Sequence, residues 1–329
     1  MLALVIRRLA ILVPTLLLLS FAVFLLSLGL RSDRAAETRA GENASVAAIE
    51  QAKADLHLDD PLMQRYGGWL GNAVQGDFGR SFVRLETVED GSGSKQQGVT
   101  VSSEVTRALP RTAALIGVAF VFGATMGMVA GIIGGTRPGS LADRVTFVFS
   151  AVGLAVPSFW IGMLLVSLFA VRLGWLPAVG YVEISEGGYW AWFEHLLIPG
   201  LALGFLPAAI IARQTRAALA DVMGSTYIRT AWAKGASLRR VVFHHALKNA
   251  ASAPLTVFGL VITALLGGTV IIESLFGIDG IGALVVTSVR SSDVPMLQGI
   301  VMAFIIVTMF INLLIDIAYG LLDPRVRIT

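Results

Sequence analysis

The chain has 329 residues, of which 55% are hydrophobic and 14% are charged, and its formal net charge is +3. Because an average soluble domain carries about 25% charged residues, this composition argues against a soluble protein, and the long apolar runs indicate an integral membrane protein. Cysteine is absent, which excludes disulfide bonds, thiolate nucleophiles and cysteine-based metal sites.

Six segments are long enough to cross a bilayer as α-helices, which takes about 20 apolar residues. The first follows Arg7 and Arg8, as a signal peptide would. However, its uncharged run is longer than a signal core and no clear cleavage site follows it. We therefore expect an all-α polytopic membrane protein with six transmembrane helices. They cover about residues 9–30, 113–135, 145–171, 196–212, 251–272 and 295–318.

The segment between the first two spans, residues 31–110, is much longer than the other loops. It has mixed charge and helix-like patches, and its stretch EDGSGSKQQG (residues 89–98) predicts a flexible loop. We expect a small extracytoplasmic subdomain here. The domain organisation is then an N-terminal transmembrane helix (1–30), this segment (31–110) and a transmembrane core (111–329).

The second span contains glycine at every fourth position. Such a stripe of small residues allows another helix to approach closely. We favour packing within the chain as its role, and contact with another subunit is the alternative. The stripe consists of Gly123, Gly127, Gly131 and Gly135.

Lys and Arg residues in the short loops set the orientation, because cytoplasmic loops carry an excess of them. With the N-terminus inside, only Arg172 and Arg290 fall in the short outer loops. Both termini are therefore predicted to be cytoplasmic. The inner side receives Arg7, Arg8, Arg137, Arg144, seven basic residues between positions 213 and 248, Arg325 and Arg327.

The cytoplasmic segment at about residues 213–250 reads as helix, glycine break, helix. Gly235 is placed as a C-terminal glycine cap, and Ser237 can cap the second helix. Arg239 and Arg240 then fall in the first turn of that helix, where the helix dipole disfavours cations. We expect an external group to supply the compensating negative charge. Binding to anionic lipid and a role in orientation alone are the alternatives.

Within this segment, RTAWAKGASLRRVVFHHALKNA (residues 229–250) resembles the cytoplasmic EAA loop of ABC importer permeases. The general pattern has EAA, three residues, Gly, nine residues and I-x-L-P. Its glutamate, isoleucine and proline are missing here, which fits the dipeptide/oligopeptide/nickel subfamily. Other stretches resemble the B-type transmembrane subunit of that subfamily: GDFGRS (76–81), VPSFWIGMLLVSLFAVRLGWLPAVG (156–180), ESLFGIDGIG (273–282), DVPMLQG (293–299) and NLLIDIAYGLLDPRVR (312–327).

The resemblance implies a permease subunit of an ATP-driven, binding-protein-dependent importer in a bacterial or archaeal cytoplasmic membrane. It implies half of a translocation path and a loop that docks on a cytoplasmic ATPase. The residues expected to couple to the ATPase by resemblance are Thr230, Ala231, Lys234, Gly235, His245, Ala246 and Leu247. The charge argument adds Arg239 and Arg240. Implied partners are a homologous second permease, two ATPase subunits or domains, an extracytoplasmic binding protein and membrane lipid, without nucleic acid.

The chain shows no nucleotide-binding motif, since GGTRPGS (residues 134–140) lacks the Gly-Lys-Ser/Thr ending of a phosphate loop. We therefore expect no enzyme activity, cofactor or metal in this chain, and ATP and Mg in the partner ATPase subunits. The alternative function is an ion-coupled secondary transporter or channel, which predicts buried ionisable groups or inverted repeats. Peptides are the expected substrate, although relatives also carry nickel or glutathione.

Overall fold

The computed structural model describes residues 2–29, 36, 45–55, 60–90 and 93–322, so the predicted inner residues Arg325 and Arg327 lie outside the described part. The chain forms two compact units, one from residues 1–111 and 280–329 and one from residues 112–279. Helix α5 (Val101–Thr136) contributes its first turns to one unit and the rest to the other.

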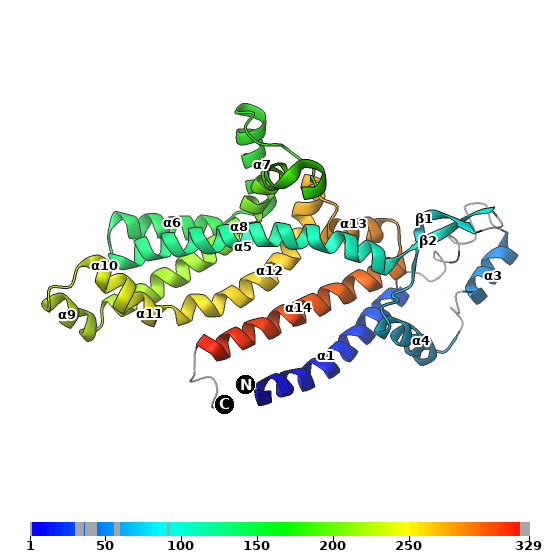
Figure 1. Cartoon of the computed structure of the whole chain (residues 1–329), viewed down its shortest axis with the longest axis horizontal. Helices are drawn as coiled ribbons and strands as arrows, with labels where there is room; N and C mark the ends of the chain where they lie inside the picture. Colours follow the sequence, from blue (N-terminus) through cyan, green and yellow to red (C-terminus); the bar gives the residue numbers. More distant parts are fainter. Residues whose placement is uncertain (1, 30–35, 37–44, 56–59, 91–92, 323–329) are drawn as a thin grey trace. The chain divides into compact units, whose positions relative to one another are not determined.

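In the first unit, α1 and α14 run side by side (Figure 1). Helix α4 packs on the second half of α1, where the rings of Phe21 and Tyr66 meet edge to face at 5.0 Å. The Tyr66 hydroxyl lies 2.7 Å from Ser20 Oγ. Besides the start of α5, this unit contains α1 (Leu2–Gly29), α3 (Val46–Asp55), α4 (Leu62–Val74), β1 (Arg80–Asp90), β2 (Gly93–Thr100), α13 (Ile281–Arg290) and α14 (Val294–Leu322).

Strands β1 and β2 form an antiparallel hairpin, which corrects the predicted all-α class and the predicted flexible loop at residues 89–98. The register pairs Leu85 with Gly98 and Asp90 with Gly93, so most of the predicted loop is paired strand. The small and polar residues that suggested a loop satisfy their backbone groups across the hairpin instead. The chain is predominantly helical with one two-stranded sheet in the described residues.

Two of the quoted motifs, GDFGRS and DVPMLQG, meet in this unit although more than 200 residues separate them. Buried Ser81 donates a hydrogen bond from Oγ to the carboxylate of buried Asp293. The Phe82 backbone N–H also donates to Asp293, at 3.3 Å. The hairpin is thus attached to the start of α14. The apolar core beside it contains Val101, Ala108, Ile281, Leu284, Met296 and Ile300.

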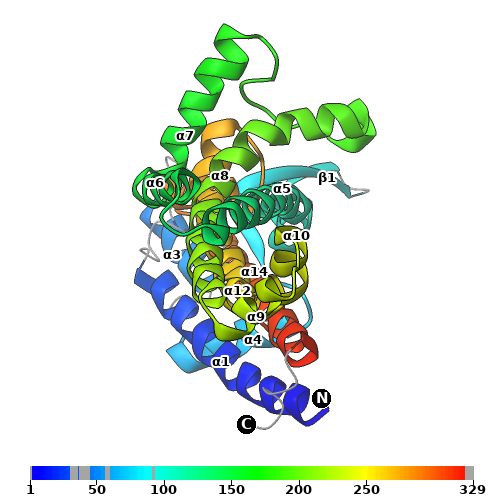
Figure 2. The ribbon, with the colours of Figure 1, turned by 90° about the vertical axis from the view of Figure 1, so that its left-hand side faces the viewer.

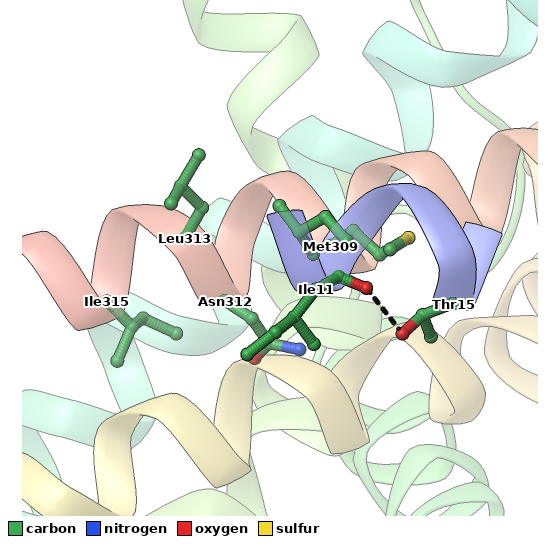
Figure 3. A pocket seen from close by; sticks show the side chains of 7 residues that line it. Ile11, Thr15, Met309, Asn312, Leu313 and Ile315 are labelled. Carbon is green, nitrogen blue, oxygen red and sulfur yellow. Dashed lines mark hydrogen bonds between the residues drawn. The ribbon is translucent and has the colours of Figure 1, made fainter. Parts of the chain in front are cut away.

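A crevice of about 380 Å³ lies between α1 and α14 (Figure 3). Its lining is mostly aliphatic, and the Thr15 hydroxyl donates to the Ile11 carbonyl at 2.8 Å. This polar group is therefore satisfied within α1, as membrane helices require. The lining residues are Ile11, Leu12, Thr15, Met309, Asn312, Leu313 and Ile315.

The second unit is built around α8, whose apolar stretch is the most buried of the candidate membrane spans. Its main core contains Leu115 of α5, Leu203 of α8 and Ile272 and Phe276 of α12, with the neighbours that pack on them. The unit contains the rest of α5, α6 (Leu141–Ala155), α7 (Ser158–Leu165), the π-helix η1 (Val166–Arg172), α8 (Ile184–Met223), α9 (Thr226–Ala233), α10 (Leu238–Arg240), the π-helix η2 (Val241–Ala246), α11 (Leu247–Ala250) and α12 (Ser252–Phe276).

The glycine stripe of α5 packs against α8 inside the unit, as favoured from the sequence. A Cβ atom at Gly127 would lie 2.7 Å from the Ala208 carbonyl oxygen, and one at Gly131 would lie 2.8 Å from the Ala212 carbonyl oxygen. Cβ atoms at Gly123 and Gly135 would also come within 3 Å of α8. Only glycine therefore permits this helix spacing.

The predicted third span, residues 145–171, is not a continuous helix. It breaks between α6 and α7, whose axes are bent by 106° (Figure 2). Pro157 lacks a backbone N–H and occupies the N-cap of α7, and Val156 before it is extended with φ −91° and ψ 126°. A proline disfavours helical geometry in the residue before it, so α6 ends there.

The predicted fourth span, residues 196–212, is longer than expected. Helix α8 extends from Ile184 to Met223 with a backbone break at Gly188, and it contains buried Pro199 and Pro207. Among the described residues, α5, α8, α12 and α14 are each long and apolar enough to cross a membrane. The bent α6–α7 pair makes a possible fifth span, and the described apolar part of α1, Ala10–Leu25, is shorter.

Two glycines of α5 allow a matched test of the α5–α8 spacing. Gly131→Ala places a Cβ 2.5 Å from Thr215 Cβ, whereas Gly117→Ala meets nothing within 4 Å. We expect G131A to destabilise by about 1–3 kcal/mol through overpacking. G117A should be neutral or slightly stabilising, because alanine favours helix over glycine. The thermal unfolding midpoints of the two purified variants in detergent check this, and equal midpoints would contradict the packing.

Candidate functional site

Two short helical arms follow α8, and together with the bend between them they contain every residue that the sequence predicted for ATPase coupling. We call residues 226–250 the elbow. Its first arm is α9, and its second arm is the continuous helical run of α10, η2 and α11. Residues 234–237 form the bend between the arms.

The bend is a Schellman motif, the hydrogen-bonded turn that ends many helices at a left-handed residue. Gly235 has φ +79° and is that residue. The Gly235 N–H donates to the Trp232 carbonyl at 2.9 Å, and the Ala236 N–H donates to the Ala231 carbonyl at 3.2 Å. Glycine adopts positive φ without the steric clash of a Cβ. The predicted glycine break is therefore confirmed in position.

The second arm begins after Ser237, which occupies the N-cap with φ −67° and ψ 155°. Its backbone carbonyl accepts the Val241 N–H at 2.9 Å, but its side chain makes no capping hydrogen bond. The middle of the arm, Val241–Ala246, is a π-helix rather than an α-helix. π-Helical turns are uncommon and occur frequently at functional sites.

The underside of the elbow is apolar and packs on the last turns of α8. Ile228 of the first arm and Val241, Ala246 and Ala250 of the second arm are buried together with Leu219 of α8. Both arms therefore share one small core with α8. Because packed interiors have low compressibility and transmit strain, we expect the elbow to move with the end of this helix.

The predicted coupling residues divide between the surface and this core. Arg239, Arg240, Lys234, Gly235 and Thr230 are exposed. Ala231, His245 and Leu247 are partly buried, and Ala246 is fully buried in the core. The exposed members lie on both arms and in the bend between them, whereas Ala246 belongs to the core of the elbow.

The exposed surface is cationic, and its own sequence supplies no counter-charge. No Asp or Glu occurs between Asp221 and Glu273. Arg239 and Arg240 lie in the first turn of the second arm, where the positive end of the helix dipole adds to their charge. This surface is therefore complementary to an acidic partner.

Sequence reasoning missed three exposed aromatic residues of the elbow. Tyr227 and Trp232 are 44% and 42% exposed, and Phe243 is 62% exposed. The Asn249 side-chain amide donates to the Tyr227 hydroxyl at 2.9 Å and thereby links the two arms. Aromatic residues and Arg are both enriched at protein interfaces. Aromatic residues within a basic helical segment were therefore the sequence signal that could have identified them.

The adjacent His244 and His245 lie in the π-helical part of the second arm. Their rings lie edge to face with centroids 5.3 Å apart. In the part of the chain that the structure describes, no three His, Asp or Glu side chains are grouped to hold a metal ion. The surface instead combines rigidity, charge and exposed aromatic area, which are properties that favour docking.

Comparison with known families covers almost the whole chain. Residues 123–328 match the family described as "Binding-protein-dependent transport system inner membrane component". Residues 1–116 match the N-terminal part of such membrane components.

Individual relatives agree with this match. A probable peptide ABC transporter permease of Sinorhizobium fredii is 35% identical over 98% of both chains. A putative peptide transport system permease of Brucella abortus is 35% identical over 99% of both chains. The glutathione transport system permease of Escherichia coli is 37% identical, also over 99% of both chains.

Among solved structures, the inward-facing MetNI methionine ABC transporter has the same fold, with a TM-score of 0.54 at 17% sequence identity. The match covers 67% of this chain and 97% of that chain. Members of this family are membrane permeases whose ATPase is a separate subunit. The chain therefore belongs to the inner-membrane components of binding-protein-dependent transport systems, and it is a multi-pass permease of an ATP-driven ABC importer in the cytoplasmic membrane.

Proposed function

We propose that the elbow is the surface through which this permease receives movement from its ATPase. One observation carries the proposal: an exposed cationic face and an apolar underside belong to the same two short arms, and the underside is packed on the end of α8. A force applied to the exposed face would therefore act on a membrane helix. A surface loop without this core would bend instead of transmitting the force.

The elbow residues have different roles in this proposal. Arg239, Arg240 and Lys234 orient the elbow on an acidic groove of the ATPase, and Thr230 lies on the same face. Ala231, His245 and Leu247 fill the junction between the contact surface and the core. Gly235 sets the angle between the arms, and Ala246 holds the second arm on α8.

For the wider architecture, the proposal adopts the topology expected from the sequence. We propose six transmembrane helices, including α1 (within residues 1–30) and the bent α6–α7 pair, with both termini in the cytoplasm. Residues 31–110 lie outside and receive the substrate-binding protein, and residues 111–329 form the permease core. The hairpin is attached to α14 through Ser81 and Asp293. A binding protein that contacts the hairpin would therefore act on a membrane helix.

The chain is one half of the translocation path, of the B type, and a homologous permease supplies the other half. Two ATPase subunits or domains bind ATP and Mg, whose chemistry lies outside this chain. The substrate is proposed to be a short peptide, because the relatives named for peptides and glutathione match nearly the full length at 35–37% identity.

Reconstitution separates this proposal from an ion-coupled transporter or channel. With the second permease, the ATPase subunits and the cognate binding protein in proteoliposomes, uptake of a labelled peptide should require ATP and the binding protein. The same vesicles without ATPase subunits should show no uptake under a proton or sodium gradient. Gradient-driven uptake by the permease alone would contradict the proposed function.

Charge reversal tests the docking face. We expect Arg239→Glu and Arg240→Glu each to lower the ATPase retained on the purified permease by about tenfold or more, since juxtaposed like charges cost several kcal/mol. Arg137→Glu, an exposed cation outside the elbow, is the matched control and should retain the ATPase. Quantitative co-purification at several salt concentrations measures the effect, and equal retention in all three variants would refute docking through the arginines.

The bend is tested by changing Gly235, where a Cβ would meet nothing within 4 Å, so only the φ of +79° is perturbed. Gly235→Val should cost roughly 1–2 kcal/mol in the bend and reduce ATP-dependent uptake. Gly235→Asn, which tolerates positive φ, should retain most of it. Gly224→Ala, at an ordinary φ of −76°, is the control. Wild-type uptake in G235V would show that the bend angle is unimportant.

A further inference from the structure

Helix α6 has an inverted distribution of polar and apolar residues. Its buried residues are Asp143, Thr146, Ser150 and Gly153, whereas Val145, Phe147, Val148 and Val152 are exposed. This is the pattern of a membrane helix that turns its polar side chains inward and its apolar side chains to lipid. Asp143 lies in the first turn of α6, at its cytoplasmic end in the proposed topology, and a buried acid is expected to have a partner.

The partner of Asp143 is Arg216 of α8. The Arg216 Nε–H donates to Asp143 Oδ1 in a direct ion pair. The other carboxylate oxygen, Oδ2, accepts the Gly139 backbone N–H at 2.9 Å, in the turn before α6. The Arg216 guanidinium also lies over the Phe147 ring, 5.8 Å from its centroid. Both carboxylate oxygens and the cation are thus held in one geometry.

The ion pair lies where α8 meets the elbow. Arg216 precedes Leu219 on α8 by three residues, and Leu219 is the α8 member of the core that holds both elbow arms. At its other end, α6 leads through the bend at Pro157 into α7. Gly162 of α7 packs against Phe276 and Ala202, in the main core of the second unit. A continuous series of contacts therefore runs from the elbow through α8 to α6 and α7.

Close packing holds α6 against α8 where Gly153 meets Ala209, and the ion pair adds a directional contact at the start of α6. A charge-assisted hydrogen bond is directional and stronger than a neutral one, and here it joins α6 directly to α8. Movement of α8 along or around its axis would therefore be transmitted to α6 through this pair. Without the ion pair, α8 could shift at this end without moving the start of α6.

We propose that Asp143 and Arg216 are positioning residues for transport, and that their ion pair stays closed through the cycle and makes α6 follow α8 when the elbow moves. The inference rests on the proposed function of the elbow. It assigns no contact with substrate or nucleotide to either residue. When the pair is lost, ATP hydrolysis and substrate movement become uncoupled.

The first test uses Asp143→Asn with Arg216→Met in the complete transporter. The introduced asparagine would still accept the Gly139 N–H, the introduced methionine would keep much of the apolar stem, and no unpaired charge would remain. We expect the complex to assemble and to hydrolyse ATP, while substrate transported per ATP falls by about fivefold or more, the low end of typical coupling energies. Wild-type transport per ATP in this variant would overturn the proposal.

The second test uses the absence of natural cysteine in the chain. D143C/R216C should be uncoupled in the same way, and bridging the two thiols with a short bifunctional thiol reagent should restore transport per ATP. Loss of transport on bridging would mean that the contact must open, and it would overturn the proposal. Each single cysteine variant, treated with the same reagent, controls for modification.

Two further outcomes are decisive. Failure of both the Asn/Met variant and the unbridged cysteine pair to assemble would show a folding role and would overturn a role in coupling. Failure of the proposed elbow function appears differently, because the wild-type complex itself would then show no ATP-dependent uptake. The transport-to-hydrolysis ratio is the readout that a purely structural role, in an assembled complex, would leave unchanged.

Discussion

The close approach of α5 and α8 is the constraint on which the second unit depends. Four glycines of α5 remove every Cβ that would collide with α8, and α8 is in turn the most buried candidate span. Van der Waals packing is the main attraction between helices in a membrane, so this close spacing fixes the position of α8 against α5. With α8 held in this way, the elbow at its end has a rigid base, and the polar face of α6 has a helix to pack against.

The elbow shows how a short segment can be both rigid and exposed. Its aliphatic side chains point into a small core with α8, its charged and aromatic side chains point outward, and a left-handed glycine separates the two arms. The Schellman hydrogen bonds satisfy the carbonyl groups that the end of the first arm leaves without helical partners. A docking surface of this kind loses little conformational freedom on binding, because the arms are ordered beforehand.

The local features of the chain were predictable from sequence, and the long-range ones were not. The glycine bend, the position of Arg239 and Arg240 in the first turn and the glycine face of α5 follow from residue type and spacing. The hairpin was missed because its second strand is rich in Gly, Ser and Gln, which are poor strand formers. The third span was predicted as one continuous segment, since a single proline such as Pro157 does not reveal whether its neighbours will preserve the helix axis.

The sequence by itself determined the membrane class, the family and the approximate position of the elbow, because hydropathy, charge placement and motif spacing are properties of contiguous residues. Only the tertiary structure decided which residues pair across the chain: Ser81 with Asp293, Arg216 with Asp143, and the elbow underside with Leu219. The first two contacts join residues that are far apart in the chain, and all three depend on helix rotation and distance. Hydropathy constrains neither quantity, because an apolar helix can present any of its faces to lipid.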